Sequence, residues 1–324
     1  MTPLPAIVKA IPLARYRFTA RLREPLRLPD YAGSLLRGQF GAALRNVACM
    51  TRQPVCGGCP LQASCPYSRI FEAPPPPAHS LQKFSAIPNA YVIEPPPIGV
   101  QDLPAGGLLT FHMVLAGDAL AQLALVVFAW QRALAQGLSK SRSTADLLAV
   151  DWIAADGAAH PIWHCATPVL LDHPAVLDFP AAPAGPLQAI TLNIHTPLRL
   201  QQQGRPLRPD QLSPRALVAS LAMRVALVME FHARQGDWGC GMHEQVRLAE
   251  TLDHETDLRW HDWIRYSSRQ QQEMTLGGVL GRWTLHGSAG TLAALWPRLW
   301  LGQWLHAGKN ATMGMGGYSL QAHA

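Results

Sequence analysis

Apolar and polar residues alternate along several short segments of this chain, with the two-residue period of a half-buried β-strand. In the first segment, residues 15–23, Arg17, Arg21 and Arg23 fall between apolar positions. Successive side chains of a strand point to opposite faces, so the pattern predicts a strand with one basic face. Pro25 ends the segment, because proline cannot donate a backbone hydrogen bond to a ladder.

A helical period follows in residues 33–47, where apolar side chains recur every three or four positions. Such a stripe predicts a helix with one face packed against a core. A second, strongly apolar helix is expected over 119–136, with Asp118 as its N-cap and Gly137 at its end. The strands expected in this half are 108–115, 147–153 and a segment after Gly157.

A similar set of strands and helices is expected in the second half of the chain. A strand is expected over 187–200, and Ser213 with Pro214 begins a helix that runs through Phe231. The later elements are a hairpin of 258–265 and 274–285, a tryptophan-rich helix with Trp296, Trp300 and Trp304, and a final strand from Tyr318. The order β-α-β-β-α-β therefore occurs twice, which predicts an α+β protein with tandem ferredoxin-like (RRM-like) domains.

The length of 324 residues also indicates two domains. We expect an N-terminal ferredoxin-like domain over residues 1–170 and a C-terminal one over residues 187–324. Residues 171–186, which are rich in alanine and proline, are the expected linker.

Four of the six cysteines lie close together in the spacing C-x6-C-x2-C-x5-C. Thiolates two residues apart chelate one ion with little strain, and two more thiolates close a tetrahedral site. The pattern predicts an insertion at about 49–75 that holds a structural metal. Zinc is the first choice, and an iron–sulfur cluster is the alternative. The expected ligands are Cys49, Cys56, Cys59 and Cys65.

The chain is basic, with 27 Lys and Arg against 21 Asp and Glu, and a net charge of +6. Only four of the 27 basic residues are lysines, so 23 are arginines, whose planar forks fit phosphates and base edges. This balance supports an anionic partner such as RNA.

A membrane partner is not expected. The longest charge-free apolar run, residues 119–131, is too short to cross a bilayer. The cysteines do not have the pattern of a secreted disulfide framework. These observations predict a cytoplasmic protein.

Glycines are concentrated in residues 306–318, between the tryptophan-rich helix and the last strand. Glycine lets backbone amides approach a ligand closely, and concave rows of amides bind phosphate. Lys309 adds a positive charge, and Asn310 and Thr312 add neutral donors. The alternative interpretation is a helix C-cap followed by a loose connection.

Gly308, Gly314 and Gly316 have the spacing G-x5-G-x-G. Together with the runs at 277–282 and 300–306, and with residues 33–45 in the first half, this loop resembles a known family. The family is that of the CRISPR-associated, repeat-processing endoribonucleases of the RAMP superfamily. In these proteins such a loop precedes the last strand of a ferredoxin-like domain.

The resemblance implies that the protein matures precursor CRISPR RNA. In that family the ribose 2′-OH attacks the adjacent phosphate without a metal, leaving a cyclic phosphate and a 5′-OH. The reaction needs in-line geometry, proton transfer and a cation near the developing charge. The implied partners are CRISPR repeat RNA, the mature guide RNA and other subunits of a CRISPR effector complex.

Members of the family often carry a catalytic histidine between the first strand and the first helix, but segment 24–46 contains none. Tyr31 is one substitute, which could orient or protonate a reacting group, with Arg37 neutralising the phosphate. The alternative is a packed tyrosine and a solvated arginine.

His306 with Lys309 is a second candidate pair, because a histidine that titrates near neutral pH would stand beside a phosphate-binding loop. The alternative is a histidine that caps the helix. His79 with Lys83, in a proline-rich segment, is a third pair.

RNA recognition is expected to be mainly of shape and backbone, with base-edge contacts from arginines in a hairpin. The residues expected to bind RNA are Arg17, Arg21, Arg23, Arg45, Arg282, Lys309, Asn310, Thr312, Gly314, Gly316 and Gly317.

Two other functions compete with the endoribonuclease. One is a non-catalytic RNA-binding subunit of a CRISPR effector ribonucleoprotein, which the absent histidine favours and the C-terminal signature opposes. The other is a redox protein with a cluster at the four cysteines, which would absorb visible light.

Overall fold

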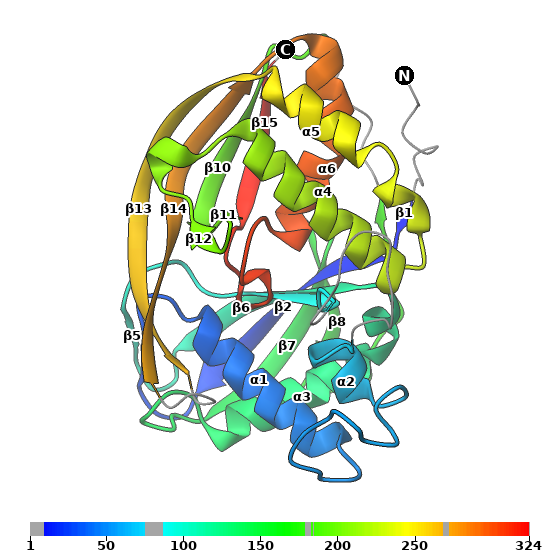
Figure 1. Cartoon of the computed structure of the whole chain (residues 1–324). Helices are drawn as coiled ribbons and strands as arrows, with labels where there is room; N and C mark the ends of the chain where they lie inside the picture. The colour runs from blue at the N-terminus through cyan, green and yellow to red at the C-terminus, as the bar shows by residue number, and fades with distance from the viewer. Residues whose placement is uncertain (1–9, 75–86, 179–182, 184, 268–271, 324) are drawn as a thin grey trace. The chain divides into compact units, whose positions relative to one another are not determined.

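The computed structural model describes residues 10–74, 87–178, 183, 185–267 and 272–323 (Figure 1). They form two compact units. The N-terminal unit consists of residues 10–178 with 227–234, and the C-terminal unit holds the other described residues. The division after Asp178 falls within the segment 171–186 that the sequence indicates as a linker.

The N-terminal unit has a five-stranded antiparallel sheet in the order β4-β6-β2-β7-β8. Its strands are β2 (Leu13–Leu22), β4 (Tyr91–Glu94), β6 (Leu108–Ala116), β7 (Ala145–Ile153) and β8 (Ala159–His164). Two helices, α1 (Gly33–Ala48) and α3 (Leu123–Gln136), pack against each other over one face of the sheet (Figure 1). Without β8, this is the βαββαβ order of a ferredoxin-like fold.

The C-terminal unit has the same topology, with an antiparallel sheet in the order β13-β14-β10-β15. Its strands are β10 (Ala189–Leu198), β13 (Asp253–Ser267), β14 (Gln272–His286) and β15 (Tyr318–His323). The connecting helices are α4 (Pro214–Phe231), of which residues 214–226 belong to this unit, and α6 (Ala289–Leu305). These two topologies confirm the predicted α+β class with tandem ferredoxin-like units.

Short elements complete the described chain. In the first half they are β1 (Ala10–Ile11), β3 (Leu26–Leu28), α2 (Pro66–Phe71), β5 (Gln101–Leu103), the 3-10 helix η1 (Gly117–Gln122) and β9 (Leu177–Asp178). In the second half they are β11 (Gln201–Gln202), β12 (Arg205–Pro206), η2 (Pro209–Gln211), η3 (Gly236–Gly239), α5 (Met242–Glu250) and η4 (Ala311–Met313).

The predicted start of the second helix was wrong. The segment from Gly117 to Gln122 is a 3-10 helix, and α3 begins only at Leu123. Asp118 makes no side-chain capping bond there, because its carboxylate binds the guanidinium groups of Arg69 and Arg234 at 2.6 and 3.1 Å. No helix in the described part of the chain is long and apolar enough to span a bilayer.

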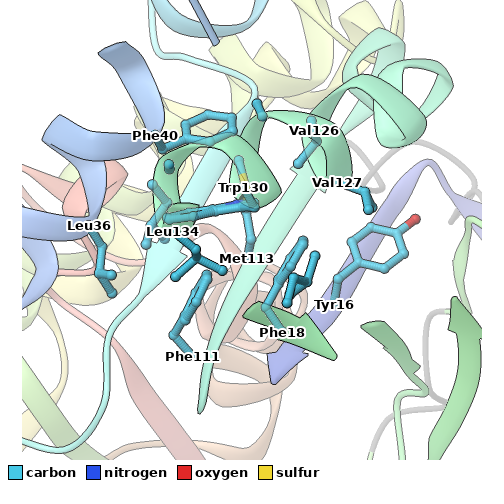
Figure 2. Close-up of a cluster of buried hydrophobic side chains, with 14 of the residues drawn as sticks. Tyr16, Phe18, Leu36, Phe40, Phe111, Met113, Val126, Val127, Trp130 and Leu134 are labelled. Atoms are coloured by element: carbon cyan, nitrogen blue, oxygen red, sulfur yellow. Dashed lines mark hydrogen bonds between the residues drawn. The ribbon is translucent and has the colours of Figure 1, made fainter. Parts of the chain in front are cut away.

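Aromatic side chains from both layers meet in the core of the N-terminal unit (Figure 2). Trp130 of α3 is fully buried, with its ring centroid 4.4 Å from that of Phe111 and 5.1 Å from that of Phe40. Its indole N–H points at the Met113 sulfur, 3.4 Å away. Buried aromatic pairs add stabilisation beyond the area that they bury, so Trp130 joins α3 to both the sheet and α1.

We therefore expect Trp130→Ala to lower the free energy of unfolding by about 3–5 kcal/mol, because it leaves a cavity among rings that cannot close it. Phe128→Ala is the matched control, since Phe128 lies on the same helix with 41% of its surface exposed. The control should cost no more than about 0.5 kcal/mol. Urea denaturation of the full chain measures both, and equal losses would contradict this account of the core.

Candidate functional site

The glycine-rich loop joins the end of α6 to the start of β15. His306 and Asn310 both adopt positive φ, at 60° and 64°, so the chain reverses sharply after the helix. A Cβ on Gly308 would lie 2.5 Å from the carbonyl oxygen of Arg199, and one on Gly316 would lie 1.9 Å from that of Ala307. Glycine is required at these two positions because the loop packs against neighbouring backbone.

The loop is held by an irregular part of β10. The pairing of β10 with β14 shifts register between Ile194 and Leu198, which indicates a bulge. The Thr196 hydroxyl accepts from the Gly317 amide at 2.7 Å, and the Pro197 carbonyl accepts from the Gly316 amide at 3.0 Å. The Thr196 hydroxyl also donates to the carbonyl oxygen of Gly314 at 2.6 Å.

These bonds change the expected role of the glycines. The Gly316 and Gly317 amides donate to β10, and the Gly314 amide donates to the carbonyl oxygen of Ala311 at 2.8 Å. The amides of Gly314, Gly316 and Gly317 thus have acceptors within the protein, which disfavours a phosphate cradle built from them. RNA binding by these residues stays a prediction, with the side chains of Lys309, Asn310 and Thr312 as the other groups of the loop.

His306 lies inside this loop with none of its surface exposed. Its Nδ1 is 3.0 Å from the carbonyl oxygen of Gly314 and 3.2 Å from that of Met315. A nitrogen beside two carbonyl oxygens donates, so the ring carries hydrogen at Nδ1. In this position His306 fixes the loop, and its burial favours an anchoring role over direct contact with RNA.

Lys309 is exposed, and its backbone amide donates to the carbonyl oxygen of Arg199 at 2.9 Å. The Arg199 guanidinium donates to the carbonyl oxygen of Gly277 at 2.8 Å. Nearby, the Arg208 guanidinium stacks 3.9 Å over the ring of Trp260. We call Arg199, Arg208 and Trp260 the arginine cluster. It lies beside the glycine-rich loop, within the same unit.

The two arginines of this cluster repel each other. Burial lowers the pKa of the Arg199 guanidinium, and the charge of Arg208 lowers it further, while the Asp262 carboxylate raises it. In the described part of the chain neither arginine forms an ion pair within 4.0 Å. An anion bound between them would relieve this repulsion. This cluster was not predicted from the sequence, in which Arg199 lies near the end of the predicted strand and Arg208 in the short segment before the predicted helix.

The other catalytic candidates belong to the N-terminal unit. Tyr31 is 2% exposed, so its ring is part of the core. The Arg37 guanidinium lies 4.6 Å over the ring of Phe71 and is half-buried. This packing favours a structural role for Tyr31, whereas a role of Arg37 in catalysis stays a prediction. His79 and Lys83 lie outside the described residues.

The predicted basic strand face is partly neutralised. Arg17 pairs with Asp151 at 3.0 Å and Arg23 pairs with Asp146 at 2.6 Å, whereas Arg21 is exposed. Their part in RNA binding is untested.

Two further arginines predicted to bind RNA have different surroundings. Arg45 donates to the carbonyl oxygens of Gln53 and Pro54, so it holds the loop that begins the cysteine insertion. Arg282 is exposed on β14, opposite Asp257 of β13 in the strand register. RNA binding by Arg45 and by Arg282 stays a prediction.

The four clustered cysteines line one pocket at the end of α1 and the start of α2. The Thr51 hydroxyl lies between two of them, 3.4 Å from the sulfur of Cys59 and 4.0 Å from that of Cys49. Among the described residues, no three His, Cys, Asp or Glu side chains are arranged as a metal site. The pocket gathers the predicted ligands, and metal binding stays a prediction.

Family models match the two halves of the chain separately. A model described only as an N-terminal domain matches residues 11–175, just over half of the chain. The model of the CRISPR-associated endoribonuclease Cas6 matches residues 192–318, which include the arginine cluster and the glycine-rich loop. No curated protein matches the chain.

Solved structures share the fold at low sequence identity. Thermus thermophilus Cas6 has a TM-score of 0.53 at 16% identity, over 96% of this chain and 99% of that one. A Cas6 product complex has a TM-score of 0.56 at 17% identity, and the match covers 95% of this chain and 100% of that one. A partial Cas6-RT-Cas1–Cas2 complex has a TM-score of 0.56 at 15% identity. This match covers 99% of this chain but only 47% of that one. The present chain therefore spans less than half the length of that relative.

Residues 192–318 thus match the family of the CRISPR-associated endoribonuclease Cas6, and solved Cas6 structures share the fold of nearly the whole chain.

We expect His306→Ala to lower the free energy of unfolding by about 1–3 kcal/mol, because two buried carbonyl oxygens each lose a hydrogen bond and that of Gly314 keeps only the Thr196 hydroxyl. Lys309→Ala, three residues further along the same loop, should change it by no more than about 0.5 kcal/mol. Thermal denaturation of the two variants tests this difference. A His306→Ala protein as stable as the wild type would show that the ring does not anchor the loop.

Proposed function

We propose that this protein is an endoribonuclease that cleaves CRISPR repeat RNA to release guide RNAs. The observations that support this function most are the exposed Lys309, whose backbone amide is bonded to the carbonyl oxygen of Arg199, and the repelling guanidinium groups of Arg199 and Arg208. These three cations are of the kind needed to hold a phosphodiester and to stabilise the charge that develops on it. They lie in the part of the chain that matches the Cas6 model.

In the proposed reaction, the 2′-hydroxyl of one ribose attacks the phosphate that follows it. The bond from phosphorus to the 5′-oxygen of the next nucleotide breaks, giving a 2′,3′-cyclic phosphate and a 5′-OH. The protein holds the two groups in line and stabilises the phosphate with Lys309, so the step needs no metal. Of the other candidates, His306 acts by positioning the loop, and Arg37 is a further cation in the N-terminal unit.

A non-catalytic RNA-binding subunit of a CRISPR effector ribonucleoprotein is the second candidate function. The burial of both His306 and Tyr31 favours it, because a general acid or base must reach the proton that it transfers. Binding to other CRISPR subunits remains part of this proposal. The larger relative of known structure is a complex of Cas6-RT-Cas1 with Cas2.

Cleavage of repeat RNA in EDTA separates the two functions. We expect the wild-type protein to cut at one position and to leave a cyclic phosphate, which gel mobility before and after acid treatment identifies. Lys309→Ala should slow single-turnover cleavage by roughly 10- to 100-fold, because it removes one charge that stabilises the transition state. Arg247→Ala, which removes an exposed charge from α5 of the same unit, is the control.

A wild-type protein that binds the repeat but leaves it intact would exclude the enzyme and support the binding subunit. Equal rates for Lys309→Ala and Arg247→Ala would exclude a role for the loop lysine in catalysis.

We also propose that the cysteine insertion binds a structural zinc ion. Cys49 follows the last residue of α1, and Cys65 precedes the first residue of α2. Four thiol sulfurs suit zinc, which four cysteines bind in structural sites. With Cys56 and Cys59, these residues would tie the ends of two helices together through the insertion, away from the glycine-rich loop in sequence.

The purified protein should contain one zinc ion per chain by elemental analysis, and it should be colourless. Cys59→Ser should lower the zinc content and the melting temperature, because zinc binding contributes folding free energy. Cys165→Ser is the control, since Cys165 lies outside the insertion and is exposed. A metal-free wild-type protein would contradict the zinc site, and visible absorption after anaerobic purification would support the iron–sulfur alternative.

A further inference from the structure

A short basic loop follows α3 in the N-terminal unit, and hydrogen bonds hold it in a fixed shape. Leu138 and Ser143 exchange backbone hydrogen bonds of 2.8 and 3.0 Å across its base. The hydroxyls of Ser139, Ser141 and Ser143 form a chain with spacings of 2.7 and 2.8 Å. Its remaining members, Lys140 and Arg142, are exposed. The serines order the backbone of the loop before any ligand binds. Binding at the two cations therefore costs little loss of backbone conformational entropy.

The loop is attached to the far end of β2. The Ser143 hydroxyl donates to the carbonyl oxygen of Pro25 at 2.6 Å. The Glu24 carboxylate accepts from the amide and the hydroxyl of Thr144, each at 2.7 Å. These contacts bring the basic end of β2, with Arg21 and Arg23, beside Lys140 and Arg142.

Positive charge dominates this end of the unit. Five cationic side chains meet two carboxylates, those of Glu24 and Asp146. Glu24 is engaged with Thr144, and Asp146 is engaged with Arg23. In the described part of the chain no ion pair involves four of the cations, and all five are exposed. The five are Arg21, Arg23, Arg132, Lys140 and Arg142, and of these Arg23 is the one with an ion pair, to Asp146.

An open hollow of about 630 Å³ adjoins these charges, between α3 and β7. Phe128 and Arg132 of α3 line it together with Arg23 and Cys165. Phe128 keeps 41% of its surface exposed, and the Arg132 guanidinium lies 4.9 Å from its ring centroid. An exposed ring beside a planar guanidinium is the kind of surface on which an unpaired nucleobase stacks.

We propose that this basic loop and hollow form a second RNA-binding surface, which holds a single-stranded stretch adjoining the repeat. Lys140, Arg142 and Arg21 contact its phosphates, and a base stacks on Phe128 and Arg132. A paired base cannot stack there while it remains in a helix, so the occupant is single-stranded. The inference rests on the proposed function, because it assumes that the protein binds repeat RNA.

The test compares two RNAs, the repeat alone and the repeat extended by ten unpaired nucleotides on one side or the other. The extension should tighten binding to the wild type by roughly tenfold, because stacking and phosphate contacts add to the repeat contacts. Phe128→Ala, and Lys140→Ala combined with Arg142→Ala, should each remove most of that gain and leave binding of the repeat alone unchanged. For the double variant, the slope of log affinity against log salt should fall by about 1.4, since two phosphate contacts to a single strand are lost.

Cys165 gives a readout that does not depend on mutation. The extended RNA should protect Cys165 from alkylation, while the exposed Cys240 in the C-terminal unit stays reactive and serves as the control. Arg247→Ala should keep the full gain from the extension.

The outcomes separate the two proposals. A wild-type protein that binds neither RNA overturns the proposed function. A wild-type protein that binds the repeat, gains nothing from the extension and leaves Cys165 reactive overturns only the second surface. That result would favour a protein partner, in place of RNA, as the occupant of the hollow.

Discussion

The bulge in β10 is the constraint on which the rest of the candidate site depends. A regular strand would use its backbone groups in the ladder with β14 and β15. Because the register shifts between Ile194 and Leu198, the Thr196 hydroxyl and the Pro197 carbonyl are available to the glycine-rich loop instead. The loop can pack there only without a Cβ at Gly308 and Gly316. The packing of the loop on β10 therefore requires both the bulge and the two glycines.

This arrangement divides the loop into two parts that differ in burial. The half near β15 is buried, and His306 and the hydroxyl of Thr196 satisfy its carbonyl oxygens. The half near α6 carries the exposed Lys309, whose amide is fixed to the end of β10. Anchoring one half lets the other present a charge at a defined position. A preorganised charge stabilises a developing anion without first having to be ordered.

Much of the fold could be predicted from the sequence, because its signals are local. Alternation in residues 15–23 and the apolar stripe in residues 33–47 predicted β2 and α1, and each depends only on neighbours along the chain. The four-residue strand β4 (Tyr91–Glu94) was not predicted as a strand, since it is buried throughout except at its last residue and shows no alternation. The helix α5 was also missed.

The site was harder to predict than the fold, because its chemistry depends on contacts between distant segments. Glycine spacing located the loop correctly, but the acceptors of the Gly316 and Gly317 amides come from β10, more than a hundred residues earlier. The burial of His306 likewise depends on how the loop folds back, which no local pattern encodes. The pairing of Arg199 with Arg208 arises only when a hairpin brings both ends of one segment together.

That hairpin occupies a defined place in the duplicated topology. It lies between the first strand and the first helix of the C-terminal unit, as segment 23–32 does in the N-terminal unit. Such a joint is fixed at both ends by regular structure, and lengthening it costs little closure entropy. Each copy of the fold can therefore change the length and charge of its own joint while keeping its core. Insertions at these two segments would therefore change the surface of each unit and leave its core unaltered.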